Sequence, residues 1–353
     1  MSRSTRFGIE EEFVLLDAGT LSPVSAGGLR ESIPPSDADG ARFSAEFATS
    51  QIETATEPVR SLSEAAQQVE RMRRMLAEHA PSETVVAATG APFTMAGPAQ
   101  ISSSPHYDDV SALIGRLASE HIVNGLHVHV EVSDDEERIR ALRRLREALP
   151  VLLALSANSP FAGGVSSGLA SWRSTQIRRL PVSWGPPAFR DADEYHRTVD
   201  QLVSVGLLPA RSSVSWAVRL SDRYETVETR VCDAQLRTDD TLLLAALTRA
   251  IVVTENRVEH PMTPEMLDGS LWLAARHGMK ARLPSVHVDA ETAWNAVERM
   301  LDDIGPVLDE LGDAEFVRDR LDRLRMEGTG SQRQLRAYET GGAGGLARLF
   351  LQS

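Results

Sequence analysis

The chain has 353 residues, of which 42% are hydrophobic and 25% charged, so it is long enough to bury a large core. Its formal net charge of −13 argues against a general nucleic-acid binder or a surface held on anionic lipid. The single cysteine, Cys232, excludes an internal disulfide and a cysteine-based zinc site. The N-terminal residues lack the apolar stretch of a signal peptide, and no apolar run is as long as a membrane span. We therefore expect a cytoplasmic protein without nucleic-acid or membrane partners.

The first predicted strand covers residues 6–17. Ile9, Phe13 and Leu15 fall on one parity, and Glu10 and Glu12 fall on the other. Successive side chains of a strand point to opposite faces, so the two carboxylates share one face of the sheet.

The rest of the chain interleaves predicted strands with predicted helices. Strands are predicted at 42–55 (a pair, or one strand with a bend), 85–93, 124–132 and, as a hairpin, 212–238. Helices are predicted at 61–80 (capped by Ser61 or Ser63), 104–122, 134–160, 239–257 and over most of the C-terminal third. Residues 18–40 and 160–190 are predicted to be loops. This order favours a single α+β domain over 1–353.

Three predicted strands carry ionisable side chains at alternate positions: Glu10 and Glu12; His127, His129 and Glu131; Glu228 and Arg230. A spacing of two residues places each set on one face of its strand. The solvent face of an antiparallel sheet usually mixes Thr, Lys, Ser and Gln, whereas these sets combine carboxylates, imidazoles and arginines. The pattern therefore indicates a functional face.

Glu46 and Glu53 add two carboxylates to the possible cluster. Carboxylate oxygens suit Mg²⁺, which in nucleotide enzymes bridges acidic side chains to phosphates. Arg173, Arg219 and Arg230 could neutralise a phosphate or a substrate carboxylate. Each piece also has a purely structural interpretation, because glutamate runs are often solvated and arginines often form cross-strand ion pairs or cap loops.

One ordered set of motifs joins these signals: Gly8-Ile9-Glu10-Glu11-Glu12, SQIETAT, GLHVHV, LSANSPF, SWRS and ETVETRVCD. In this order the motifs resemble the carboxylate–amine ligase family related to glutamate–cysteine ligase, in its type 2 branch. The similarity continues to GGAGGLARL near the end of the chain. The resemblance implies a glutamine-synthetase-like catalytic domain over 1–353. Its central, mainly antiparallel sheet would line a funnel-shaped active site, with helices packed on the other face.

The resemblance also implies an activity. ATP bound with Mg²⁺ would phosphorylate a substrate carboxylate, and an amine would attack the acyl phosphate to give an amide, ADP and phosphate. Arg230 would lie near the transferred phosphoryl group, and Arg173 would hold the acceptor carboxylate or a phosphate. Matched by motif, the metal ligands would be Glu10, Glu12, Glu46, Glu53, His127 and Glu228, and the nucleotide-binding arginines Arg173, Arg219 and Arg230. The implied partners are a small carboxylic acid and a small amine. Separately, apolar helical stripes in the C-terminal third could serve a homodimer or belong to the core.

Two departures from the family pattern concern the substrates. Relatives often carry Gly-Thr-His-Pro where this chain has Gly90-Ala91-Pro92, and Trp-Asp-x-Arg where it has Trp216-Ala217-Val218-Arg219. A histidine and an aspartate are thus missing near the expected pocket. Loss of a polar partner usually means that a different substrate edge is recognised. An acid other than glutamate or an amine other than cysteine stays open.

Other readings of the same residues also stay open. His127 and His129 with a carboxylate could bind a transition metal in a hydrolase. A protein of the same fold could bind nucleotide without turning it over. Residues 164–168 match the pattern of a nucleophile elbow, but no apolar strand precedes them.

Overall fold

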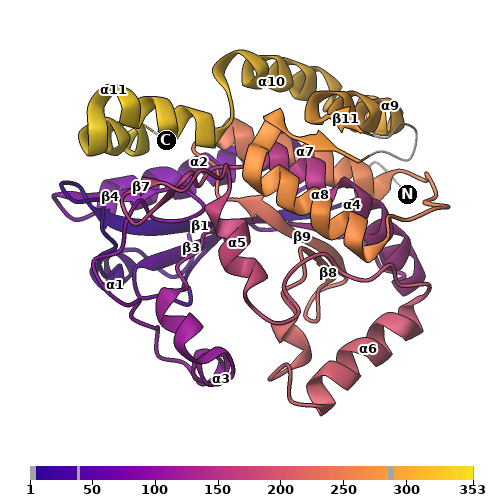
Figure 1. The fold of residues 1–353 in the computed structure, drawn as a ribbon, viewed down its shortest axis with the longest axis horizontal. Coiled ribbons are helices and arrows are strands. Elements are labelled where there is room, and N and C mark those ends of the chain that lie inside the picture. Colours follow the sequence, from indigo (N-terminus) through magenta and orange to yellow (C-terminus); the bar gives the residue numbers. More distant parts are fainter. Residues whose placement is uncertain (1–4, 38–39, 285–289, 353) are drawn as a thin grey trace.

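An antiparallel sheet of seven strands organises the computed structural model, which describes residues 5–37, 40–284 and 290–352 (Figure 1). The strand order is β2-β3-β1-β5-β9-β8, and β4 also pairs with β1. The strands are β1 (Phe7–Asp17), β2 (Arg42–Ala45), β3 (Gln51–Ala55), β4 (Thr84–Ala87), β5 (Gly125–Glu131), β8 (Val218–Leu220) and β9 (Thr226–Asp233). Two small ribbons pair β6 (Phe161–Ala162) with β7 (Val165–Ser166) and β10 (Arg282–Leu283) with β11 (Glu291–Thr292).

Helices lie on both sides of this sheet but pack densely on only one. In Figure 1, α4, α7 and α8 lie on one side with α9, α10 and α11 beyond them, while α3 and α6 lie apart on the other. The helices are α1 (Gly27–Ser32), α2 (Leu62–His79), α3 (Pro105–Ile114), α4 (Asp135–Ser156), α5 (Trp172–Arg178), α6 (Ala192–Ser204), α7 (Thr238–Val253), α8 (Pro264–His277), α9 (Ala293–Leu311), α10 (Ala314–Glu327) and α11 (Gly330–Leu351). The mixed helices and antiparallel sheet confirm the predicted α+β class.

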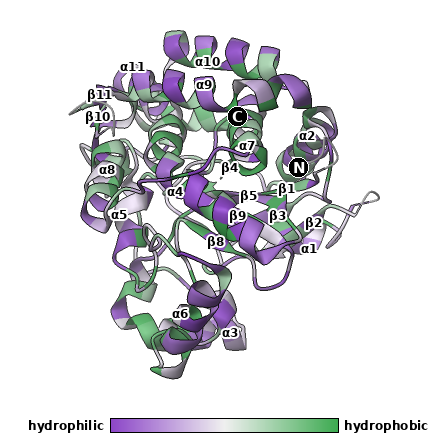
Figure 2. Cartoon of the chain, turned by 90° about the vertical axis from the view of Figure 1, so that its right-hand side faces the viewer, coloured by the Kyte–Doolittle hydropathy of each residue, from purple (hydrophilic) through white to green (hydrophobic). Residues whose placement is uncertain are grey.

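The main core fills the space between the sheet and its helical layer. Phe7 and Ile9 of β1 and Val128 of β5 contribute buried side chains to it. Helix α7 is buried along nearly its whole length, and Figure 2 shows it as largely hydrophobic beneath the more hydrophilic α9 and α10. In this part of the sheet, the side chains at the alternate strand positions point away from the main core and form the polar face. Among the described residues, no helix is both long and apolar enough to cross a membrane.

A β-bulge in β9 changes which face the end of that strand presents. His129 lies opposite Glu228, but Leu126 lies opposite Cys232, so β9 has one more residue than β5 over this stretch. The extra residue reverses the alternation, and Cys232 enters the main core although its parity matches that of Glu228. Burial raises the pKa of the Cys232 thiol to about 12. The cysteine is therefore a buried apolar residue.

The two predicted loops contain short regular elements. Residues 18–40 include α1, and residues 160–190 include the β6–β7 ribbon and α5. Elements this short show no clear hydrophobic period, so the sequence pattern missed them. The helix predicted over 104–122 is also interrupted, because α3 ends at Gly115, whose φ of 59° is left-handed, and a 3₁₀ turn follows.

A buried ion pair anchors β1 from behind the polar face. Glu11 points toward the helices, and Arg73 of α2 donates to both of its carboxylate oxygens at 3.0 and 2.6 Å. Arg73 also donates to the main-chain carbonyls of Gln235 and Leu236, just beyond β9, and Thr241 donates to Glu11 at 2.5 Å. This network joins β1, α2 and the start of α7.

We predict that Arg73→Met destabilises the protein by about 3–5 kcal/mol, because it leaves the Glu11 charge buried without its partner. Denaturant-induced unfolding measures the loss. The double change Arg73→Met with Glu11→Leu should recover part of it, since no lone charge then remains. Losses that simply add in the double variant would contradict the coupling.

Candidate active site

The sheet register brings the polar residues of five strands together. Glu10 of β1 lies opposite His127 of β5, and Glu12 lies opposite Glu53 of β3. His129 lies opposite Glu228, which is itself opposite Arg219 of β8. Antiparallel pairing puts directly opposed residues on the same face, so residues distant in sequence form one continuous patch.

Two groups of side chains in this patch have the geometry of cation sites. The ligand atoms of Glu10, His127 and Glu228 lie within 4.8 Å of one another, and so do those of Glu12, Glu53 and His127. We call them the first and second ligand groups. His127 belongs to both, with Nδ1 3.3 Å from Glu10 and Nε2 3.6 Å from Glu12.

Glu46 belongs to neither ligand group, although it was predicted with the other metal ligands. It lies close enough to act on them electrostatically. Burial, together with the charge of Glu12, raises the pKa of Glu46 to about 8. Burial and the charges of Glu10 and Glu46 likewise raise the pKa of Glu53 well above its usual value. The second ligand group therefore carries more negative charge than the protein's own cations neutralise.

The first ligand group is balanced by arginines and histidines. Burial alone would raise the pKa of Glu228, but Arg230 and Arg219 overcome it and hold the pKa well below its usual value. Burial also opposes ionisation of Glu10, yet the neighbouring His127 and His129 bring its pKa well below normal. These two carboxylates are ionised at neutral pH, as cation ligands must be.

The three predicted arginines have different surroundings. Arg219 binds Glu228 through Nε at 2.6 Å and Nη2 at 3.2 Å, and its Nη1 donates to the carbonyls of Ser212 and Val214. Arg230 contacts Glu228 through Nη1, which also lies 3.4 Å from His127. In the structure, Arg219 is thus the ion-pair partner of a predicted ligand, and Arg230 faces the patch.

Arg173 reaches the polar face from α5, beside His127 and Gly125. Its side chain comes from α5 and donates to the carbonyls of Arg230 and Val231 at 3.0 and 3.2 Å. Asp233 accepts from Ser159 and from Ser171, the N-cap of α5, and so joins this helix to the end of β9. A Cβ on Gly125 would lie 2.6 Å from Arg173 and 2.8 Å from His127, so a larger residue there would displace one of these side chains.

Several residues at the patch were not predicted by the motif match. Thr226 and His129 border the first ligand group, while Phe47, Tyr107 and His121 gather near Glu46. Burial and then the charge of Glu46 raise the pKa of the Tyr107 hydroxyl, and burial with Arg173 lowers the pKa of His121 to about 4. His129 follows the same alternation as His127, so the pattern did carry a signal for it.

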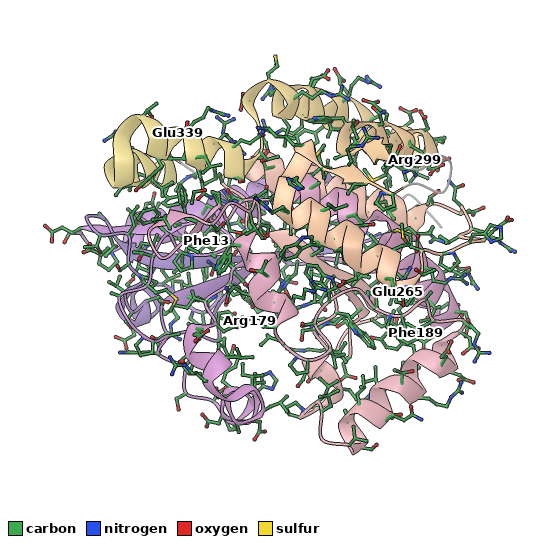
Figure 3. All side chains as sticks on the ribbon, in the orientation of Figure 1. Phe13, Arg179, Phe189, Glu265, Arg299 and Glu339 are labelled. Atoms are coloured by element: carbon green, nitrogen blue, oxygen red, sulfur yellow. The ribbon has the colours of Figure 1, made fainter. Side chains whose placement is uncertain are left out.

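The patch is open at one end. A cleft of about 440 Å³ opens at the first ligand group, between Gly8 at the start of β1, Arg42 of β2 and Tyr224 in the turn before β9. His129 and Thr226 also line it. Elsewhere, the 3₁₀ turn that follows α3 is joined to the end of α5, because Arg179, labelled in Figure 3, pairs with Glu120 at 2.7 Å.

Comparison with known proteins identifies the family to which the chain is similar. A model of glutamate–cysteine ligase family 2 matches residues 6–352. A protein of Saccharopolyspora erythraea, provisionally named glutamate–cysteine ligase 2-2, is 36% identical over 346 residues, covering 95% of this chain and 88% of that protein. A provisionally named glutamate–cysteine ligase 2-3 of Mycolicibacterium smegmatis is 34% identical over 349 residues, covering 96% of this chain and 95% of that one.

Solved structures show the same fold at low sequence identity. A bifunctional glutathione synthetase of Pasteurella multocida has a TM-score of 0.72 at 17% identity and covers 99% of this chain and 52% of its own. A glutamate–cysteine ligase of Francisella tularensis, in complex with AMP, has a TM-score of 0.70 at 15% identity and covers 99% and 87%. The family match shows an ATP-dependent ligase of the carboxylate–amine class. The chain belongs to glutamate–cysteine ligase family 2.

We predict that Glu46→Gln stabilises the cation-free protein at pH 8 and above, because ionising Glu46 there places another negative charge beside Glu12. A folded-state pKa raised above the unfolded value lowers stability as pH increases from the unfolded pKa to the folded one. Thermal unfolding should show a gain of about 2 °C or more at pH 8.5 and little change at pH 5. Equal shifts at both pH values would show that the charge of Glu46 is not the cause.

We also predict that divalent cations bind more tightly as pH increases from 6 to 8.5. The cation needs ionised ligands, whereas the raised pKa values of Glu46 and Glu53 keep protons bound in the cation-free protein. Calorimetry in buffers of different ionisation enthalpy should detect proton release on binding at pH 7. Binding without proton release would contradict the assigned pKa directions.

Proposed function

We propose that the polar face of the sheet activates a small carboxylic acid as an acyl phosphate, at the expense of ATP and with Mg²⁺ bound. The observation that carries this proposal is the pair of ligand groups sharing His127 beside Arg230. Phosphoryl transfer depends mainly on positioning and on cations around the phosphoryl oxygens, and both ligand groups suit hard cations. The excess of carboxylates over arginines means that a polyphosphate would bind only with such cations.

The shape of the site supports an orientation for the two substrates. The open cleft at the first ligand group has room for a nucleotide, whose phosphates would then lie toward Glu10 and Glu228. The acid would lie toward Glu12 and Glu53, so that the transferred phosphoryl group passes between the two ligand groups. Bound cations would supply charge neutralisation along this path.

Each arginine has a role that fits its contacts. Arg230 faces the point where the ligand groups meet and can stabilise charge on the transferred phosphoryl group. Arg219 keeps Glu228 ionised and oriented. Arg173 already donates to two main-chain carbonyls and would thereby hold the backbone of Arg230 in place. Its remaining N–H groups would donate to the substrate carboxylate.

The amine substrate carries a positive charge before it reacts. Glu46, with Tyr107 and Phe47 beside it, provides an acidic and partly apolar environment. Such an environment can bind the ammonium group and accept the proton that the amine loses. L-Glutamate and L-cysteine are the first acid and amine to test. The missing histidine near Gly90 and the missing aspartate at Ala217 keep other acids and amines within the proposal.

ADP release over a matrix of acids and amines tests the reaction directly. We expect ADP only when ATP, Mg²⁺, an acid and an amine are all present, and a product whose mass equals acid plus amine minus water. ADP formed without an amide product under every pairing would contradict the ligase. Hydrolysis of an amide without nucleotide would instead favour the metal-dependent hydrolase.

Single charge removals test the site. Glu10→Gln, Glu53→Gln and Glu228→Gln should each abolish nucleotide turnover, because each removes one formal charge from a ligand group at nearly constant shape. Glu137→Gln, on the exposed first turn of α4, is the matched control and should turn over ATP normally. Circular dichroism checks the fold of each variant. Normal turnover in any two of the three site variants would refute the assignment.

Arg230→Lys separates a catalytic arginine from a structural one. A lysine keeps the charge but cannot reproduce the planar fork, so kcat should fall by about 100-fold or more. The KM for ATP should change much less. A loss of less than about threefold would make Arg230 only the ion-pair partner of Glu228.

A further inference from the structure

His129 has the surroundings of a metal ligand, although the motif match assigned that role only to His127. Its Nδ1 lies 3.0 Å from the Thr226 hydroxyl, and its Nε2 lies 3.4 Å from Glu10 and 3.8 Å from Glu228. Only 12% of the side chain is exposed, and Nε2 is buried without a hydrogen-bond partner. A buried nitrogen that faces two carboxylates without bonding to either requires an explanation.

The Thr226 hydroxyl can accept a hydrogen bond from Nδ1–H of His129, the tautomer that leaves Nε2 without a proton. A histidine that binds a metal usually donates its other ring N–H to an oxygen, which fixes the ring. With Nδ1–H donating to Thr226, Nε2 presents its lone pair to the oxygens of Glu10 and Glu228. The Nε2 lone pair then faces two carboxylates, an arrangement that a cation between them would stabilise.

The position of His127 gives a second, independent argument. Its two nitrogens face different ligand groups, Nδ1 toward Glu10 and Nε2 toward Glu12. His129 lies 3.4 Å from Glu10 and faces the first ligand group alone, on the side that lines the cleft. Whether His127 binds a cation in the first or in the second ligand group, His129 can supply a nitrogen ligand to the first ligand group.

We propose that His129 Nε2 binds the divalent cation held by Glu10 and Glu228, and that this nitrogen makes the first ligand group prefer Mn²⁺ to Mg²⁺. Mg²⁺ binds oxygen almost exclusively, whereas a first-row transition ion accepts imidazole together with carboxylates. The inference rests on the proposed function only for the presence of nucleotide phosphates next to this cation. Cation binding itself is a property of the chain's own side chains.

Mn²⁺ binding tests the assignment without any turnover. Free Mn²⁺ is measured by its electron paramagnetic resonance signal, with a non-hydrolysable ATP analogue present. His129→Ala should weaken Mn²⁺ binding by about tenfold or more. His196→Asn, at a histidine of α6 that pairs with Asp135, is the matched control and should bind like the wild type. Wild-type affinity in His129→Ala would mean that His129 is only an ion-pair partner of Glu10 and Glu228, and would overturn the proposal.

His129→Asn tests the metal preference while keeping a polar side chain. Its amide oxygen suits Mg²⁺, so the ratio of Mg²⁺ to Mn²⁺ dissociation constants should fall toward one. An unchanged ratio would overturn the claim about preference. This variant also guards against a folding defect in His129→Ala, since its thermal unfolding can be compared with that of the wild type.

A spectroscopic signature identifies the ligand atom. Pulsed electron paramagnetic resonance of bound Mn²⁺ should show nitrogen coupling that changes with ¹⁵N-histidine labelling and weakens in His129→Asn. Thr226→Val should weaken Mn²⁺ binding while Thr226→Ser preserves it, because only the serine keeps the oxygen that orients the ring. Nitrogen coupling unchanged in His129→Asn would overturn the assignment. If the wild type forms no amide yet shows these effects, the proposed function fails and the cation site stands.

Discussion

The structure depends on an excess of negative charge on one face of a sheet. Antiparallel pairing of β1 with β3 and β5, and of β5 with β9, brings carboxylates from distant parts of the chain within a few ångströms of one another. Two arginines balance the Glu228 side, and little on the chain balances the Glu53 side. We propose that cations complete the face, so that affinity for divalent ions and affinity for a polyphosphate both follow from the same register.

The remainder of the fold keeps this register in place. Glu11 is tied to α2 and α7 from behind, and the helical layer buries the apolar parity of the same strands. At the far end, Asp233 ties α5 to β9 and so fixes Arg173 against the backbone of Arg230. Groups that must repel one another when no ligand is bound are thus carried on strands that cannot easily separate.

Much of this face could be predicted from the sequence, because the alternation of polar and apolar residues along a strand is local information. It is visible at Glu10 and Glu12, at His127 and His129, and at Glu228 and Arg230. That these residues meet in one site was expected only from the resemblance to a family, and the strand order that brings them together came only from the structure. The bulge that turns Cys232 into the core depends on how β9 pairs with β5, which no single-strand pattern contains. Helix α5, which carries Arg173, is too short to show a period.

The central claim is that this face transfers a phosphoryl group from ATP to a carboxylate before the amide bond forms. The most direct measurement uses an acid labelled with ¹⁸O in its carboxylate, with the released phosphate analysed by mass. An acyl phosphate requires one labelled oxygen to appear in the phosphate for each amide formed. Amide formation with unlabelled phosphate would contradict the account, because the carboxylate oxygen would then never have been bonded to phosphorus.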